Sequence, residues 1–299
     1  MYATERGKGA QVRLRVALTT TSAGDGRGSV CIAVDVVRAS TTILTLVEAG
    51  VSAVRFAVSL DEARARAEAS TPRALLVGEQ GGIIAPGFDL DNSPLAVRRA
   101  PLAGRPAVVR TSNGTVLLSR LTAAAATLIG SIRNGAAVIA EAVAEAERRD
   151  LDVLICCAGQ EHGAVFALDD AIAAGFIVAC AWESHGPWAF PEQPDAPRLI
   201  DESAMAVLAL YRAFVGEGTR PDPDSVARAL LQSAGPRFIA ATGRLEDVRY
   251  CATPHASRVV PRVTLVGGEP TVRGIAPPAA SPTAPPAVPP TRQPAAPVR

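Results

Sequence analysis

Short apolar stretches recur along the chain, and most are followed by a few small polar residues and then by a stretch with helical spacing. An uninterrupted apolar run is typical of a strand that is covered on both faces of a parallel sheet. The repeated order of strand, polar turn and helix therefore predicts an α/β fold: a mostly parallel sheet with helices on both faces, with a division into two subdomains left open. The predicted strands are residues 30–34, 53–58, 74–77, 107–109, 126–130, 153–157 and 261–266.

Helix signals fill the segments between these strands. The first predicted helix, 43–49, is preceded by Ser40, Thr41 and Thr42 and ends before Gly50, which suits a helix C-terminus. The other predicted helices are 60–69, 136–149, 167–179, 202–215 and 222–231.

The two ends of the chain differ in composition from the middle. Residues 1–28 are expected to be flexible, except that 12–18 alternate between apolar and polar residues and form a candidate edge strand. The α/β domain is expected over 29–268, with a Pro-rich surface loop at 182–197. Residues 275–299 are nearly all Pro, Ala, Ser and Thr, so we expect a disordered tail.

Composition narrows the class of protein. Hydrophobic residues make up 48% of the 299 residues and aromatic residues only 4%, which predicts a sizeable core of small aliphatic side chains. A net charge of +1 gives no electrostatic case for nucleic acid or an anionic membrane as a partner. Neither a signal peptide nor a membrane-spanning run is apparent. The five cysteines form no C-x-x-C pair, which favours buried, reduced thiols in the cytoplasm and argues against zinc.

One loop, residues 78–94, combines four glycines with three carboxylates at the end of a predicted strand. The carboxylates are Glu79, Asp89 and Asp91. In α/β proteins, such a loop is a usual place for a metal ion or a phosphate group. The alternative is a surface turn in which Asp91 or Ser93 caps the next helix.

A second candidate segment follows the strand at 30–34. Asp35 ends that strand, and Arg38 precedes a helix start whose backbone N–H groups could face a phosphate group. Arg38 could then bind the phosphate in a bidentate manner. The alternative is a structural ion pair between Asp35 and Arg38, with Ser40 as a helix cap.

Three further strand ends carry polar residues. Arg110 precedes Asn113 and Gly114, in a segment that is similar to a phosphate cradle but lacks the spacing of a P-loop. Arg133 and Asn134 follow the strand at 126–130. Asp169 and Asp170 lie in the first turn of a helix, where they could reach a metal or simply stabilise the helix dipole. His162 is expected to be a solvated loop residue rather than an acid.

Several of these segments, taken in order, resemble the 2-phosphosulfolactate phosphatase family. The resemblance covers roughly residues 30–262 and rests on VDVVRASTT at 34–42, GEQGG and GFDLDNSP within 78–94, TSNGT at 111–115, Arg133-Asn134, and the segments 157–159, 168–170 and 247–251. It implies a magnesium-dependent phosphatase that acts on a small phosphorylated sulfonic acid in coenzyme M biosynthesis.

With that resemblance, the sequence predicts a site at one rim of the sheet. Asp35, Glu79 and Asp89 are the expected catalytic, metal-proximal acids, with Asp169 or Asp170 as a further ligand. Because Mg²⁺ prefers one or two carboxylates and several waters, not all of them can bind it directly. Whether Asp35 attacks phosphorus or a metal-activated water does so is open. The expected phosphate-binding residues are Arg38, Arg110, Asn113, Gly114, Arg133 and Asn134.

A different class of function is also consistent with the sequence. Gln80, Asp91, Val116 and His255 stand where the family usually has other residues. These departures leave the exact substrate open, and Gln80, Val116 and His255 favour a non-catalytic protein that keeps the fold and binds a small anion. A homo-oligomer is neither predicted nor excluded by the sequence.

Overall fold

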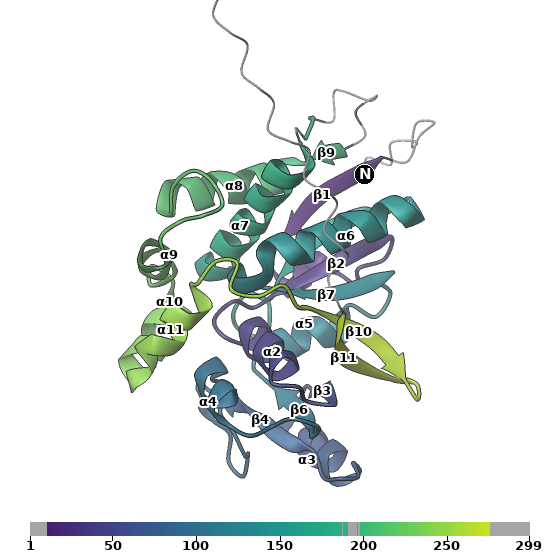
Figure 1. The fold of residues 1–299 in the computed structure, drawn as a ribbon, viewed down its shortest axis with the longest axis vertical. Coiled ribbons are helices and arrows are strands. Elements are labelled where there is room, and N and C mark those ends of the chain that lie inside the picture. The colour runs from purple at the N-terminus through teal and green to yellow at the C-terminus, as the bar shows by residue number, and fades with distance from the viewer. Residues whose placement is uncertain (1–10, 187, 191–195, 197, 276–299) are drawn as a thin grey trace, which may run out of the picture.

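The computed structural model describes residues 11–186, 188–190, 196 and 198–275. The chain is built around an eleven-stranded sheet with the strand order β5-β4-β6-β3-β11-β10-β7-β2-β8-β1-β9 (Figure 1). The predicted tail lies outside the described residues except for its first residue. The strands are β1 (Val12–Ala17), β2 (Ser29–Val34), β3 (Ala53–Ala57), β4 (Leu75–Gln80), β5 (Ile83–Ile84), β6 (Pro106–Arg110), β7 (Ala126–Gly130), β8 (Asp152–Cys157), β9 (Arg198–Ile200), β10 (Val260–Val266) and β11 (Glu269–Ile275).

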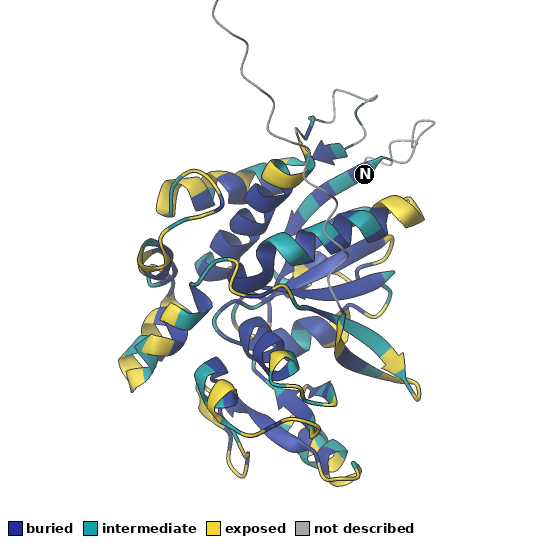
Figure 2. Cartoon of the chain, in the orientation of Figure 1, coloured by how far each residue is buried: buried dark blue, intermediate teal, exposed yellow. Residues whose placement is uncertain are grey.

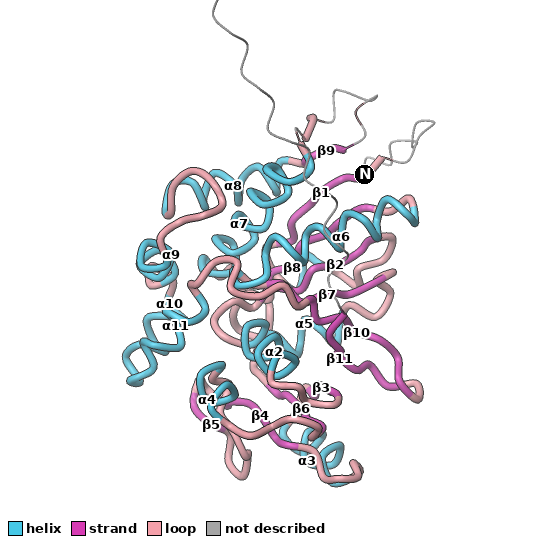
Figure 3. The backbone as a smooth tube through the Cα atoms, viewed as in Figure 1, coloured by secondary structure: helices cyan, strands magenta, loops and turns pink. Residues whose placement is uncertain are grey.

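Helices lie on both faces of this sheet (Figure 3), which confirms the predicted fold class. They are α1 (Thr20–Ala23), α2 (Ala39–Glu48), α3 (Leu60–Glu68), α4 (Pro94–Arg99), α5 (Gly114–Arg120), α6 (Gly135–Arg149), α7 (Leu168–His185), α8 (Glu202–Phe214), α9 (Pro223–Leu230), α10 (Ala234–Ile239) and α11 (Leu245–Cys251). A 3₁₀ turn (Ile132–Asn134) precedes α6, and a π-helical turn (Ala240–Arg244) joins α10 to α11. None of the described helices is long and apolar enough to cross a membrane.

The central strand β2 explains how the two layers of helices are held. All six of its residues are buried. Val30, Ile32 and Val34 pack with α6, α7 and α8, whereas Cys31 and Ala33 pack on the opposite face with α2 and α5. Because successive side chains of a strand point to opposite faces, a continuously apolar strand provides a core for both layers (Figure 2).

Close packing within one layer depends on a glycine. A Cβ atom on Gly175 of α7 would lie 2.1 Å from the carbonyl oxygen of Val207 in α8. Only glycine therefore allows the two helices to approach this closely.

One prediction about the sheet is wrong, and one feature of the sheet was not predicted. The segment at β1 is not an edge strand, because it pairs with β8 on one side and with the short β9 on the other. The sheet also consists of two parallel groups, β4-β6-β3 and β7-β2-β8-β1-β9, which are joined by the antiparallel hairpin β10–β11. That hairpin pairs with β7 and with β3 through only two residue pairs each.

Candidate active site

Loops from both parallel groups converge on a cavity of about 400 Å³. Its walls come from the segments after β2, β4, β6 and β8, together with helix α10. The lining residues are Asp35, Val37, Arg38, Glu79, Gly81, Gly82, Asn92, Thr111, Ser112, Asn113, Gln160, Glu161, Ala234, Gly235, Phe238 and Ile239. The predicted convergence of Asp35 and Glu79 is therefore present, although the two residues come from different parallel groups rather than from one rim.

Asp35 lies where β2 ends and α2 is about to begin. Its carboxylate accepts hydrogen bonds from the backbone N–H groups of Ala39, at 3.2 Å, and Gly114. Burial raises the pKa of Asp35 to about 7; the Ala39 bond opposes this shift, while repulsion from Asp169 and Glu79 adds to it. The fold therefore holds this carboxylate where its negative charge is unfavourable.

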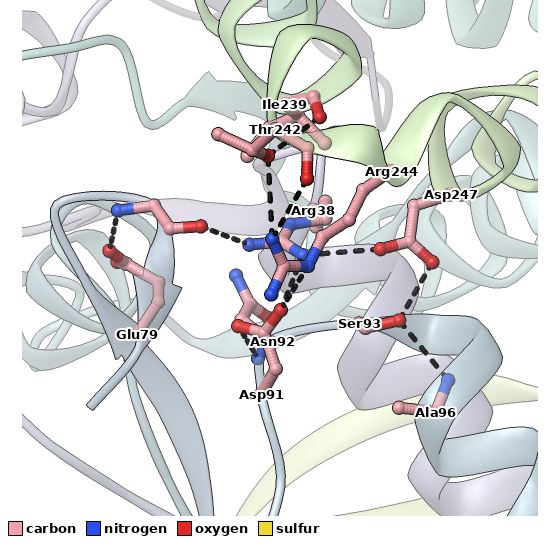
Figure 4. A network of polar contacts seen from close by, with 11 residues as sticks. Arg38, Glu79, Asp91, Asn92, Ser93, Ala96, Ile239, Thr242, Arg244 and Asp247 are labelled. Atoms are coloured by element: carbon pink, nitrogen blue, oxygen red, sulfur yellow. Dashed lines mark hydrogen bonds and ion pairs between the residues drawn. The ribbon is translucent and has the colours of Figure 1, made fainter. Parts of the chain in front are cut away.

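Glu79, at the end of β4, is 6% exposed. Like that of Asp35, its carboxylate is fixed by hydrogen bonds. Its carboxylate accepts hydrogen bonds from the backbone N–H groups of Gly82, at 2.8 Å, and Ser112, at 2.5 Å, and from the Ser112 hydroxyl at 3.3 Å. The bond to Gly82 also closes the β4–β5 turn (Figure 4). The loops after β4 and β6 thus orient a second carboxylate at the cavity.

Arg38 is not paired with Asp35, and it is not free to bind a phosphate group alone. Its Nη1 lies 3.1 Å from both Asp91 and Asp247, and its Nη2 donates to the Gly82 carbonyl at 3.0 Å. Arg244 adds an ion pair to Asp91 at 2.8 Å (Figure 4). We call Arg38, Asp91, Arg244 and Asp247 the arginine–aspartate cluster. Its two positive and two negative charges balance, so Arg38 carries little net charge towards the cavity.

The predicted phosphate cradle after β6 serves the two acids instead. The N–H of Gly114 donates to Asp35, and a Cβ on Gly114 would lie 2.7 Å from Asp35 Oδ2. Asn113 Oδ1 accepts a hydrogen bond from the backbone N–H of the exposed His162 at 3.0 Å. Arg110 donates to the Glu79 carbonyl at 2.6 Å. The glycine and the N–H groups expected to face a phosphate therefore fix carboxylates.

Arg133 and Asn134 do not line the cavity. The Arg133 guanidinium lies 3.8 Å from the centre of the Tyr250 ring and donates to the Tyr250 carbonyl at 3.1 Å. Asn134 accepts from Ser131 N at 2.8 Å and donates to two carbonyls, those of Ile129 and Val259, at 3.1 Å each. Both residues fix the turn after β7 to the C-terminal segment, which is a structural role.

Asp169 and Asp170 are buried beside Asp35 but are not among the lining residues. Asp169 accepts a hydrogen bond from the Ser233 hydroxyl at 2.7 Å. Asp170 accepts from the N–H groups of Val36, at 2.9 Å, and Gly159, at 3.0 Å, and so ties the loops after β2 and β8 together. Burial raises the pKa of Asp169 to about 6 and raises that of Asp170, to which repulsion from Asp169 and Asp35 also contributes.

Asp89 does not join the other acids. Its carboxylate accepts the backbone N–H of Leu76, near the start of β4, at 2.7 Å and pairs with Arg73 at 3.2 Å. Glu79 lies at the other end of the same strand. The loop therefore doubles back along β4, and this correction removes Asp89 from the candidate site.

The carboxylates at the cavity can be compared with the ligands that a magnesium ion prefers. In the part of the chain that the structure describes, no three His, Cys, Asp or Glu side chains gather as a metal-binding group. Asp35 and Glu79 nevertheless share the cavity, and neither makes an ion pair with a described residue. Two fixed carboxylates without a cation fit a hydrated Mg²⁺ ion, because magnesium keeps several waters.

Asn92 and Phe238 are among the cavity residues that the sequence did not single out. Asn92 lies in the predicted loop but carries no charge, and only its place beside Asp91 gave a signal. Phe238 belongs to α10, and a Cβ on Gly82 would lie 2.6 Å from its ring. No spacing in the sequence relates these two residues to Asp35, because they meet only through the tertiary fold.

The chain is similar to known proteins of one family. Residues 17–265 match the family model described as 2-phosphosulpholactate phosphatase. Three relatives are each named a probable 2-phosphosulfolactate phosphatase. The protein of Deinococcus radiodurans is 34% identical over 88% of this chain and 97% of its own length. That of Symbiobacterium thermophilum is 31% identical over 79% and 92%, and that of Thermus thermophilus is 36% identical over 78% and 86%.

Proposed function

This chain belongs to the 2-phosphosulfolactate phosphatase family, and from that premise we propose that it hydrolyses the phosphate monoester of a small organic acid with the help of Mg²⁺. The substrate that the relatives' names suggest is 2-phosphosulfolactate, which would give sulfolactate and phosphate. We extend the proposal to a step in coenzyme M biosynthesis. We also place the protein in the cytoplasm, because its five cysteines are free and buried. The observation that carries it is the pair of fixed carboxylates, Asp35 and Glu79, at one cavity.

In this proposal, Asp35 and Glu79 hold the magnesium ion. Bound there, the ion would offset the negative charge of the phosphoryl oxygens, which two carboxylates alone would repel. Backbone N–H groups from Ala39, Gly114, Gly82 and Ser112 orient the two acids before substrate arrives. Such prior orientation avoids reorganisation during the reaction.

The other walls of the cavity suit a small polar ester. Ser112, Asn113 and Gln160 supply neutral hydrogen-bonding groups, and Phe238 and Ile239 supply an apolar wall. The volume of about 400 Å³ lies in the usual range for small-molecule sites. Among the described lining residues, Arg38 is the one cation, and its charge is balanced within the arginine–aspartate cluster. A divalent ion is therefore the main positive charge available to an anionic substrate.

Phosphate release from 2-phosphosulfolactate tests the proposal. We expect release by the wild-type protein in Mg²⁺, none in excess EDTA, and recovery when Mg²⁺ is added back. Asp35→Asn and Glu79→Gln should each lose activity by at least about 100-fold, the scale of removing one preorganised group that stabilises the transition state. Asp89→Asn is the matched control: it also removes a carboxylate of the 78–94 loop, yet it should stay active because Asp89 lies near the start of β4.

Two outcomes would overturn the proposal. Undiminished release in EDTA would exclude the role given to magnesium. Binding of the substrate, seen as a rise in melting temperature, without any release of phosphate would identify the protein as the non-catalytic binder.

A further inference from the structure

Asn92 lines the cavity, and its buried amide group makes no hydrogen bond to a described residue. The residue is 4% exposed and lines the cavity with Asp35, Glu79 and Arg38. Its Oδ1 atom is buried and has no hydrogen-bond partner among the residues that the structure describes. Buried polar groups in native proteins nearly always have partners, and the exceptions call for an explanation such as a ligand.

The backbone on both sides of Asn92 is fixed. Asp91 is held by Arg38 and Arg244, and its Oδ1 accepts the N–H of Asn92 at 2.7 Å. Ser93 donates its hydroxyl to Asp247 at 2.7 Å and accepts the N–H of Ala96, which caps α4. Both neighbours are thus anchored to the arginine–aspartate cluster or to a helix, while the side chain of Asn92 is left at the cavity wall (Figure 4).

This arrangement differs from that of a structural asparagine. Asn134 is also buried, but its amide makes four hydrogen bonds to described residues and is fully used by the fold. The one hydrogen bond of Asn92 to a described residue is donated by its backbone N–H group, which nearly any residue could supply. The amide of Asn92 therefore makes no hydrogen bond that holds the described part of the fold together. Its hydrogen-bonding capacity is left for a molecule that enters the cavity.

We propose that Asn92 is a substrate-binding residue that donates a hydrogen bond through its amide to an anionic oxygen of the bound ester. Unlike Oδ1, the amide nitrogen Nδ2 is not fully buried, and no described residue accepts a hydrogen bond from it, so this nitrogen can be the donor at the cavity. A neutral donor suits this place, because Arg38 beside it is already paired with two carboxylates. The inference rests on the proposed phosphatase function and adds to it a residue that selects the substrate.

The anionic oxygen could belong to the transferred phosphoryl group or to the acid group of the organic part. Two substrates distinguish these sources: 2-phosphosulfolactate and p-nitrophenyl phosphate, which has no second acid group. If Asn92 contacts the organic acid, Asn92→Ala lowers kcat/KM for 2-phosphosulfolactate alone. If it contacts the phosphoryl group, kcat/KM falls for both substrates.

In either case we expect Asn92→Ala to lower kcat/KM for 2-phosphosulfolactate by about 10- to 100-fold, the worth of one hydrogen bond to a charged group. The melting temperature without ligand should stay equal or rise, because no bond of the fold is lost. Asn92→Asp should lose more activity than Asn92→Ala, since it places a carboxylate against an anion. The contrasting variant, Asn134→Ala, should melt at a lower temperature and keep the KM of the wild type while folded.

The result that overturns the inference alone is an active wild type whose KM and kcat do not change in Asn92→Ala. A loss of melting temperature in Asn92→Ala as large as in Asn134→Ala would also overturn it, because the amide would then be structural. A wild-type protein that neither hydrolyses either ester nor gains melting temperature with inorganic phosphate or sulfolactate would remove the proposed function, and the role of Asn92 with it.

Discussion

Replacing Asp35 by asparagine should abolish phosphate release and yet stabilise the magnesium-free protein. Burial, with repulsion from Asp169 and Glu79, raises the pKa of Asp35 from an ordinary 3.8 to about 7. Above pH 7 this difference corresponds to an unfavourable contribution to the free energy of folding of at most about 4 kcal/mol. Because Asp35 keeps some exposure towards the cavity, we expect a gain of about 1–3 kcal/mol in Asp35→Asn.

The size of the effect depends on pH in a defined way. Between pH 4 and pH 7, roughly the interval between the two pKa values, the native state binds a proton that the unfolded state releases, so the wild type loses stability as the pH rises. Asparagine carries no charge, so the advantage of Asp35→Asn should be small at pH 4.5 and full at pH 8.

Urea unfolding in excess EDTA at these two pH values measures the difference. Asp89→Asn serves as the control, because it removes the ion pair with Arg73 and should be neutral or slightly destabilising at pH 8. An Asp35→Asn protein that is no more stable than the wild type at pH 8 would refute the reasoning that Asp35 is held at an electrostatic cost. Added Mg²⁺ should raise the stability of the wild type but not that of Asp35→Asn.

Two other predictions concern charged clusters. Arg38→Met should lower the free energy of unfolding by about 3–5 kcal/mol in urea unfolding, because Asp247 would remain buried without a cation and Asp91 would keep only Arg244. A loss below about 1 kcal/mol would show that the cluster is not a buried ion-pair network. Burial opposes the ionisation of Glu145, but its bond to Arg262 and two neighbouring arginines outweigh this and lower its pKa. The stabilisation from Glu145 is therefore present above its ordinary pKa of 4.5 and is lost as the pH falls. Glu145→Gln should accordingly cost about 1–2 kcal/mol at pH 7 and little at pH 3.5, and an equal cost at both pH values would contradict this assignment.

The strands that the sequence predicts well are those with a continuous apolar run. Predicted strands 30–34 and 153–157 correspond to β2 and β8 with bounds that agree within one residue. Strand β9 has only three residues, and β11 contains charged residues and a proline, so neither gives such a run. Their positions depend on pairing with β1 and β10, which local sequence does not encode.

The same contrast between local sequence patterns and long-range contacts applies to the candidate site. The meeting of Asp35 and Glu79 at one cavity could be predicted, because each acid follows a predicted strand of an α/β fold. The contact between Arg38 and Asp247 could not be predicted, because the two residues are 209 positions apart in the chain. Asp89 was misplaced for a related reason: a glycine-rich loop can reverse direction, and its acidic residues then lie at either end of the strand.

Titration with Mn²⁺, a spectroscopic substitute for Mg²⁺, tests most directly whether Asp35 and Glu79 form a cation site. Water-proton relaxation should reveal one site in the wild type, with competition by Mg²⁺, and should show its loss in the Asp35→Asn/Glu79→Gln double variant. Asp89→Asn should bind as the wild type does. Equal Mn²⁺ affinity in the wild type and the double variant would contradict the account.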